Sequence, residues 1–184
     1  NDDFVETDGG VHNIRAFNNR GVNAARGGYS AQPMFGGPAY FYHNILYHVP
    51  SGVAFKFSAK AAGLFVYHNT IIGENLIGDP AANMHFRNNL ILGRDTPGRG
   101  ILRIANATDA YSSDYNGYRP NQGVKNQYTF LGPAKGKRLY EPSEQDWQLF
   151  PTLAAFRQAT RQEAHSREVG FDIFDNLAPP DPAK

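Results

Sequence analysis

Carboxylates gather at the start of the chain, at Asp2, Asp3, Glu6 and Asp8. In a regular strand, side chains separated by an even number of positions point to the same face, so Asp2, Glu6 and Asp8 should lie together. Carboxylate oxygens are the ligands that hard cations prefer. The pattern therefore predicts a Ca²⁺ site formed by these three residues, although such acids can equally be solvated or bind a purely structural ion.

Two histidines occupy equivalent places in the chain. His43 and His68 each stand directly before an asparagine, in the matching segments YHNILYH and YHNTIIG. A metal site is disfavoured, because no third ligand follows at a metal-binding spacing and the chain has no cysteine. We expect both histidines to be corner residues that bond to the backbone or to a ligand.

Arginines and tyrosines supply a second kind of binding chemistry. Arg87 and Arg103 lie near apolar segments, and arginine can bind a carboxylate or sulfate with two parallel hydrogen bonds. Tyr42 and Tyr67 offer aromatic faces that match the apolar faces of sugar rings. All four can also be ordinary outward-facing residues of strands.

The asparagines reveal a repeat that would position these side chains. The segments AFNNRGV, YHNILYH, YHNTIIG and RNNLILG each lead from an asparagine into apolar residues. The asparagines are Asn19, Asn44, Asn69 and Asn89, with Asn116 as a fifth, and their successive sequence numbers differ by 25, 25, 20 and 27. A period of this length with short apolar strands predicts a solenoid of stacked coils about 4.8 Å apart, with an inward asparagine at one corner.

Composition agrees with short strands and many turns. The 184 residues include 19 Gly, 12 Pro and 13% aromatic residues, which disfavours long helices. Eighteen basic and 17 acidic residues give a net charge of +1, so nothing indicates nucleic acid or an anionic membrane as partner. No apolar run is long enough to span a membrane. The opening NDDFVETDGG resembles the middle of a domain, so we expect a processed or truncated chain.

The repeat is expected to end near Tyr118. Residues 119–184 begin with polar, Gly-rich sequence and then show the best helical pattern of the chain, in DWQLFPTLAAFRQATRQEAHSRE. The predicted helix starts near Thr152 as N-cap and reaches His165. Its apolar positions are Leu153, Phe156 and Ala159.

The regular period of the first three repeats also predicts which side chains stack. Glu6, Ala31 and Lys56 precede the first three repeat asparagines by the same interval, so they should form one column. Lys56 lies between two phenylalanines that should point inward, so Lys56, Glu6 and Asp8 should point outward. Two coils, about 10 Å, would then separate Glu6 from Lys56, with Ala31 leaving room between them.

The segments DDFVETDGGVHNIRAFNN, FYHNILY, VYHNTII, FRNNLIL and SSDYNGY resemble the bacterial right-handed parallel β-helix proteins, the class that includes pectate-lyase-like polysaccharide enzymes. The resemblance implies an all-β parallel β-helix of 20–27-residue coils over 1–118. A C-terminal loop and helix extension over 119–184 would pack on it without forming an independent domain. It also implies an extracellular or periplasmic protein with a polysaccharide as partner. Another chain could supply further coils to the β-helix.

This resemblance favours a polysaccharide lyase that cleaves an acidic glycan by β-elimination. Such an enzyme neutralises a uronate carboxylate, here through Ca²⁺ near Glu6, and removes the adjacent proton with a base. Lys56 is the expected base, with His68 and Arg87 in support, and Tyr42, Tyr67 and Arg103 would bind substrate. Two alternatives stay open: a glycoside hydrolase that uses two of the N-terminal carboxylates, and a non-catalytic glycan-binding or surface protein, or a piece of a larger assembly.

Overall fold

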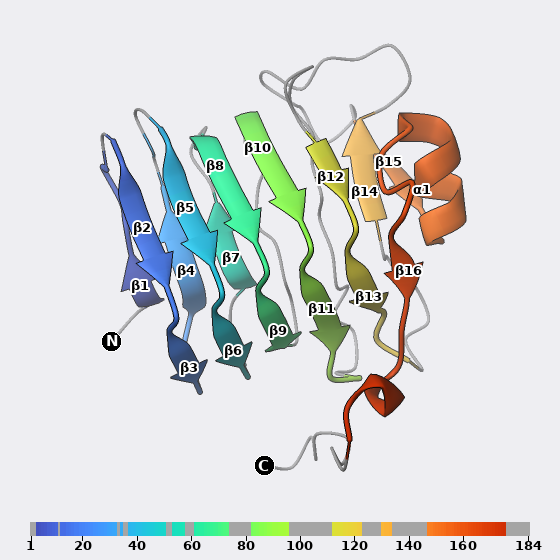
Figure 1. Cartoon of the computed structure of the whole chain (residues 1–184), viewed down its shortest axis with the longest axis horizontal. Helices are drawn as coiled ribbons and strands as arrows, with labels where there is room; N and C mark the ends of the chain where they lie inside the picture. Colours follow the sequence, from blue (N-terminus) through green and yellow to red (C-terminus); the bar gives the residue numbers. More distant parts are fainter. Residues whose placement is uncertain are drawn as a thin grey trace.

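The chain folds into a right-handed parallel β-helix, which confirms the predicted fold class (Figure 1). The computed structural model of the chain describes residues 3–10, 12–32, 34, 37–50, 53–57, 61–73, 82–95, 112–122, 130–133 and 147–175. Successive coils lie side by side along the long axis of the molecule, and the C-terminal elements lie at the far end.

Three parallel sheets form the walls of the solenoid. The three-stranded sheet contains β1 (Asp3–Glu6), β4 (Gly27–Ala31) and β7 (Val53–Phe57). The five-stranded sheet contains β2 (Ile14–Phe17), β5 (Ala39–Tyr42), β8 (Ala62–Tyr67), β10 (Ala82–Arg87) and β12 (Ser112–Asp114). The six-stranded sheet contains β3 (Arg20–Val22), β6 (Ile45–Tyr47), β9 (Thr70–Gly73), β11 (Leu90–Gly93), β13 (Gly117–Arg119) and β16 (Arg167–Glu168).

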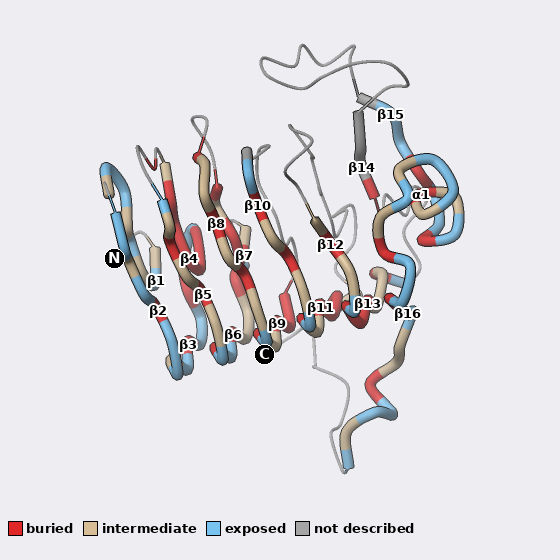
Figure 2. Tube along the Cα trace, turned by 45° about the horizontal axis from the view of Figure 1, so that its top comes forward, coloured by how far each residue is buried: buried red, intermediate tan, exposed pale blue. Residues whose placement is uncertain are grey.

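Alternation along the strands builds the core. In β8, Leu64 and Val66 are fully buried, whereas Phe65 and Tyr67 between and after them are only half-buried. The same alternation on the neighbouring strands fills the interior with apolar side chains, the largest being Tyr29, Phe41, Phe55, Phe57 and Phe86. Figure 2 shows the buried positions recurring on one coil after another. Each fully buried phenylalanine contributes roughly 1.5–3 kcal/mol of hydrophobic free energy.

The repeat asparagines form a hydrogen-bonded ladder at the corner between the five- and six-stranded sheets. The Oδ1 atom of Asn44 accepts from the backbone N of Asn19 at 3.1 Å and from its Nδ2 at 3.0 Å. The Nδ2 atom of Asn44 donates back to the carbonyl of Ala16 at 2.9 Å. The same acceptor pattern joins Asn44, Asn69, Asn89 and Asn116 in turn, and all four are buried, so the predicted inward corner position is confirmed.

The residue before each ladder asparagine turns the corner in the left-handed backbone region. These residues are Asn18, His43, His68, Asn88 and Tyr115, with φ between 53° and 59°. Asparagine tolerates this conformation better than most residues, which accounts for the Asn-Asn pairs of the repeat.

The C-terminal part adds a hairpin and a helix to one end of the solenoid. Strands β14 (Phe130–Pro133) and β15 (Trp147–Phe150) pair antiparallel, and α1 (Leu153–Thr160) follows. The Oγ1 atom of Thr152 accepts from the N of Ala155 at 3.1 Å, which confirms the predicted N-cap. Leu153 and Phe156 are buried, but Ala159 is exposed. The prediction that Ala159 belongs to the buried side of the helix is therefore wrong.

Coil stacking continues beyond Tyr118, where the sequence pattern predicted its end. The helix stops at Thr160, and β16 then pairs in parallel with β13 as the last strand of the six-stranded sheet. Ser166 takes the ladder position, because its Oγ accepts from the backbone N of Asn116 at 2.7 Å. This step was missed because a serine replaces the asparagine and lies 50 residues further along. His165 is therefore a corner residue after the helix rather than part of it.

A short 3-10 helix, η2 (Phe171–Ile173), then closes against the outside of the six-stranded sheet. Phe171 packs there with Ile72 and Leu92, and this small cluster is separate from the interior core. Among the described residues, no helix is both long and apolar enough to cross a membrane.

Candidate functional site

The outer surface of the five-stranded sheet carries most of the predicted binding residues. We call it the aromatic face and define it by the outward side chains Arg15, Phe17, Tyr40, Tyr42, Phe65, Tyr67, His85 and Arg87. They point outward because the residues that alternate with them fill the core. The face is therefore a direct consequence of the two-residue period of the strands.

Strand register arranges the aromatic face in two columns. In the first, Tyr40, Phe65 and His85 are directly opposite one another, and successive ring centroids lie 5.0 Å apart with interplanar angles of 22° and 14°. In the second, Phe17 stacks on Tyr42 at 5.0 Å. Rings stacked in this way turn their faces toward each other along the solenoid axis, so they present mainly edges and hydroxyl groups to solvent.

Tyr67, Arg87 and His85 form the polar centre of this face. Arg87 is directly opposite Tyr67, and its Nε donates to the Oγ of Ser112 at 3.2 Å. The Nδ1 atom of His85 lies 2.8 Å from the same hydroxyl oxygen. Burial raises the pKa of Tyr67, nearby Tyr40 raises it further, and the positive charge of Arg87 partly opposes both. Tyr67 therefore keeps its hydroxyl proton at neutral pH.

Two exposed histidines border the aromatic face. His43 and His68 occupy the corner, and their ring centroids lie 5.2 Å apart. Their place beside the ladder asparagines is the one predicted from sequence. Within the described ranges, no three His, Asp or Glu side chains gather closely enough to hold a metal ion.

The aromatic face is free of acidic groups over most of its length. On β2, β5, β8 and β10 none of the residues is Asp or Glu, whereas Arg15 and Arg87 are cationic. On β12, Asp114 accepts from the backbone N of His165 at 2.7 Å, and its other oxygen lies 2.8 Å from Nδ1 of that histidine. The charge of this surface thus favours an anionic ligand.

The predicted column of Glu6, Ala31 and Lys56 is wrong at its middle member. The strand register places Ser30, not Ala31, opposite both Glu6 and Lys56, while Ala31 pairs with Phe57. The reason is that the first coil is one position shorter than the repeat period and the second is one position longer. Ser30 is fully buried and its Oγ donates to Asp8 Oδ1 at 2.5 Å, so the gap expected between Glu6 and Lys56 is occupied.

Lys56, the expected base, is held in an ion pair. Its Nζ lies 3.0 Å from Oδ2 of Asp3, whose side chain is fully buried. Gly27 stands between them on β4, and a Cβ atom there would collide with Oδ1 of Asp3 and come within 3.4 Å of Cδ of Lys56. Only glycine leaves room for this pair to form across a coil. The ammonium group would have to give up its own proton, and with it this ion pair, before Lys56 could act as a base.

The strand geometry assumed for the Ca²⁺ site does not hold. Phe4 and Val5 both pack toward the core, so the strand bends between them and the alternation of faces is broken. Asp8 follows the end of β1 and accepts from the backbone N of Gln32 at 2.9 Å. Asp2 lies outside the described residues, and the Ca²⁺ site stays a prediction.

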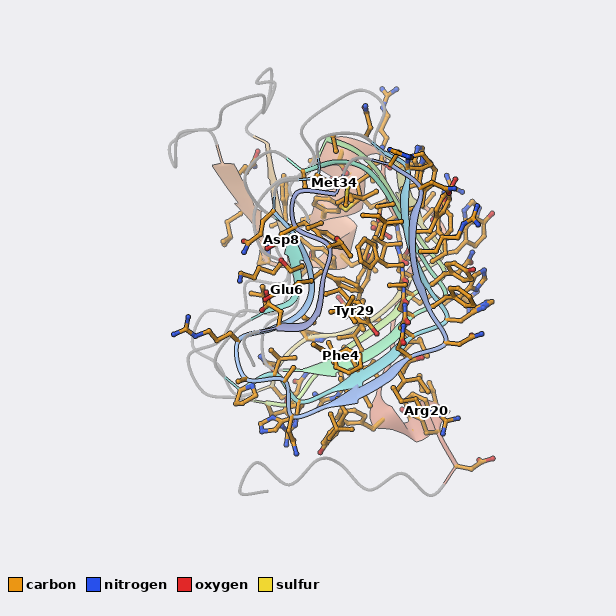
Figure 3. The ribbon with its side chains drawn as sticks, turned by 90° about the vertical axis from the view of Figure 1, so that its left-hand side faces the viewer. Phe4, Glu6, Asp8, Arg20, Tyr29 and Met34 are labelled. Atoms are coloured by element: carbon orange, nitrogen blue, oxygen red, sulfur yellow. The ribbon has the colours of Figure 1, made fainter. Side chains whose placement is uncertain are left out.

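The predicted site residues divide between two sides of the molecule. Figure 3 looks along the solenoid from its first coils and shows Glu6 and Asp8 on the side opposite the five-stranded sheet. Tyr42, Tyr67 and Arg87 lie together on the aromatic face, with His68 at its border. Arg103 lies outside the described residues.

Sequence reasoning missed three members of the polar centre and its surroundings: His85, Ser112 and Phe65. Phe65 and His85 are separated by the same step in sequence as Asn69 and Asn89, so the repeat period would have placed them in one column. Comparison with known protein families, with curated proteins and with solved structures found no match.

Proposed function

We propose that the aromatic face binds an acidic polysaccharide and that the chain cleaves it by β-elimination, as an extracellular or periplasmic lyase. The observation that supports this best is the placement of Arg87 beside Tyr67 and His85 on an outward face with no acidic residue on β2, β5, β8 and β10.

The face suits a long anionic chain. Equivalent side chains recur at every coil, about 4.8 Å apart, a distance comparable with the length of one pyranose unit. Arginine binds carboxylates through two parallel, charge-assisted hydrogen bonds. Tyrosine hydroxyls and ring edges supply further donors and apolar contact, whereas the ring faces are largely used within the columns. Specificity should therefore depend on charge and hydrogen bonds more than on ring stacking.

The proposed chemistry uses three groups. Arg87 neutralises the uronate carboxylate, which makes the adjacent C5 proton more acidic. His68 removes that proton, a carbon–carbon double bond forms between C4 and C5, and the C4–oxygen bond breaks. Tyr67 gives its proton to the departing oxygen; burial raises the pKa of this hydroxyl, so it is protonated at neutral pH and has a proton to donate.

The test is to incubate the protein with alginate, pectate and glycosaminoglycans, measuring binding by calorimetry and unsaturated product by ultraviolet absorbance. Arg87→Ala should weaken binding at least tenfold, the effect of losing about 1.4 kcal/mol of a charge-assisted interaction. The control is Arg167→Ala, which removes an exposed arginine from the six-stranded sheet and should leave binding unchanged. Equal loss in both variants would mean that binding is not located on the aromatic face.

The same experiment separates the other functions. Binding without product would identify a non-catalytic glycan-binding protein. The stacked ring columns are compatible with that function too, because they stabilise the binding surface and need no catalytic group. Products with an ordinary reducing end and no double bond would identify a hydrolase. That outcome is disfavoured because hydrolases of this kind use two carboxylates, and the strands β2, β5, β8 and β10 of the aromatic face carry none.

A further inference from the structure

A serine follows the rings of the first aromatic column. Ser112 of β12 is directly opposite His85 of β10, as His85 is opposite Phe65 of β8, and the three strands are neighbours in the five-stranded sheet (Figure 1). Their side chains point outward, because the alternating residues, among them Phe86 and Ser113, are buried. Ser112 and His85 are only half-buried, so both reach solvent on this side of the sheet.

Ser112 and His85 are placed as a nucleophile and its base. The Oγ atom of Ser112 lies 2.8 Å from Nδ1 of His85. The Nε of Arg87 donates to the same oxygen at 3.2 Å, so the hydroxyl accepts this hydrogen bond and keeps its own hydrogen to donate. In the tautomer that carries the ring proton on Nε2, Nδ1 of His85 accepts that hydrogen. A serine hydroxyl is a weak nucleophile until an adjacent base takes its proton, and this contact meets that requirement.

Neighbouring groups hold the pair and supply charge. The ring of His85 stacks on Phe65 with centroids 5.0 Å apart and an interplanar angle of 14°, which limits rotation of the imidazole. Arg87 follows two positions later on β10 and points to the same side. Its guanidinium is permanently charged and has five N–H donors, of which the bond to Ser112 uses one. A positive charge at this place stabilises negative charge that develops on a reacting oxygen.

We propose that Ser112, His85 and Arg87 form an esterase site, which removes small acyl groups from an acidic polysaccharide. The ester chemistry depends on these three side chains alone, whereas the polysaccharide as carrier of the ester rests on the function proposed above. Water is the only other reactant.

The reaction has two stages. Oγ of Ser112 attacks the carbonyl carbon of the ester while its proton passes to Nδ1 of His85, and Arg87 stabilises the negative charge on the carbonyl oxygen. The bond from that carbon to the sugar oxygen then breaks, the sugar oxygen takes the proton from Nδ1, and the acyl group stays on Ser112. Water attacks this acyl-serine and gives a proton to His85. The carboxylic acid leaves as Ser112 recovers its hydrogen from Nδ1.

A fluorophosphonate reagent, which reacts covalently with activated serines, tests the site without any glycan. Intact mass should show a single added group on the unchanged protein, and peptide mapping should locate it at Ser112. His85→Phe keeps a ring in the column but removes the base, so labelling should slow by about a hundredfold or more. Thr70→Ala removes a half-buried hydroxyl from the six-stranded sheet and is the control, which should be labelled at the unchanged rate.

A small chromogenic ester gives a second reading. With 4-nitrophenyl acetate, a burst of nitrophenolate before steady turnover indicates an acyl-serine, and Ser112→Ala should abolish it. Thermal unfolding shows whether each variant is folded, and mapping of the label on the unchanged protein depends on no variant. Absence of labelling, labelling at another hydroxyl, or equal labelling of folded His85→Phe would overturn the proposal.

The carrier of the ester is tested separately. Labelling and the burst involve no polysaccharide, so both can be read even if the protein neither binds nor cleaves a glycan. Release of acetate from acetylated pectate or alginate is the result expected. Hydrolysis of the small ester without release of acetate from either polymer would overturn the polysaccharide as carrier.

Discussion

Glu163 is a buried side chain with several hydrogen bonds, at the end of the solenoid where α1 lies. Its carboxylate accepts hydrogen bonds from the side chains of Ser113, Tyr118, Asn116 and Ser166. Burial raises the pKa of Glu163, and these hydrogen bonds lower it only in part. The carboxyl therefore binds its proton more tightly in the folded protein than in the unfolded chain.

This residue predicts a pH dependence of stability. A raised folded pKa contributes stability that is fully present below the ordinary value of 4.5 and is lost as the pH rises through the raised value. A pKa that is one unit higher in the folded protein corresponds to about 1.4 kcal/mol. Urea unfolding at a series of pH values should show that Glu163→Gln gains stability relative to the unchanged protein as the pH rises. Exposed Glu168, replaced by Gln, is the control; equal pH profiles for both variants would contradict the prediction.

Two buried tyrosines should respond differently to loss of the hydroxyl. The hydroxyl of Tyr29 is buried without a hydrogen-bond partner among the described residues, whereas Tyr118 donates to Glu163 at 2.9 Å. Tyr29→Phe should leave the free energy of unfolding unchanged or raise it by up to about 1 kcal/mol, because an unsatisfied polar group is removed. Tyr118→Phe should lower it by roughly 1–3 kcal/mol. Denaturant titration measures both, and a clear loss in Tyr29→Phe would show that its hydroxyl is satisfied.

At the scale of structural elements, the asparagine ladder holds the coils in register. Asn69 is 1% exposed and bonds to the coils on both sides, accepting from Asn44 and donating to Asn89 Oδ1 and the carbonyl of Phe41. Asn19 bonds to one neighbouring coil and is half-buried. The cost of losing an asparagine should therefore depend on its place in the ladder.

Asn69→Ala should lower the free energy of unfolding by on the order of 3 kcal/mol, because several buried groups lose their partners at once. Asn19→Ala, the matched control, should cost on the order of 1 kcal/mol, since water can reach the groups left behind. Thermal or urea unfolding compares the two. A similar small loss in both would mean that strand pairing alone sets the register.

For the whole molecule, the solenoid separates chemistry onto different sides and distinguishes its two ends. The ion pair of Asp3 and Lys56 lies on the three-stranded sheet, and the aromatic face lies across the core from it. The glycan-binding test with Arg87→Ala therefore addresses a surface separate from this ion pair. Because each coil contacts mainly its neighbours, a change on one surface should have little effect on the other.

The sequence alone was sufficient to predict the solenoid, its corner asparagines and the outward direction of Tyr42, Tyr67 and Arg87. These features follow from local rules, since strand alternation and the left-handed tolerance of asparagine act over short stretches of chain. The N-cap at Thr152 belongs to the same kind of prediction.

Only the tertiary structure decided which side chains meet. Register between coils depends on loop lengths, and a shift by a single position was enough to put Ser30 where Ala31 was expected. Phe4 and Val5 both pack toward the core, and Gly27 leaves the room in which Asp3 reaches Lys56. Contacts between distant coils, such as Glu163 with Ser113, leave no local pattern because they depend on how the coils stack rather than on neighbouring residues.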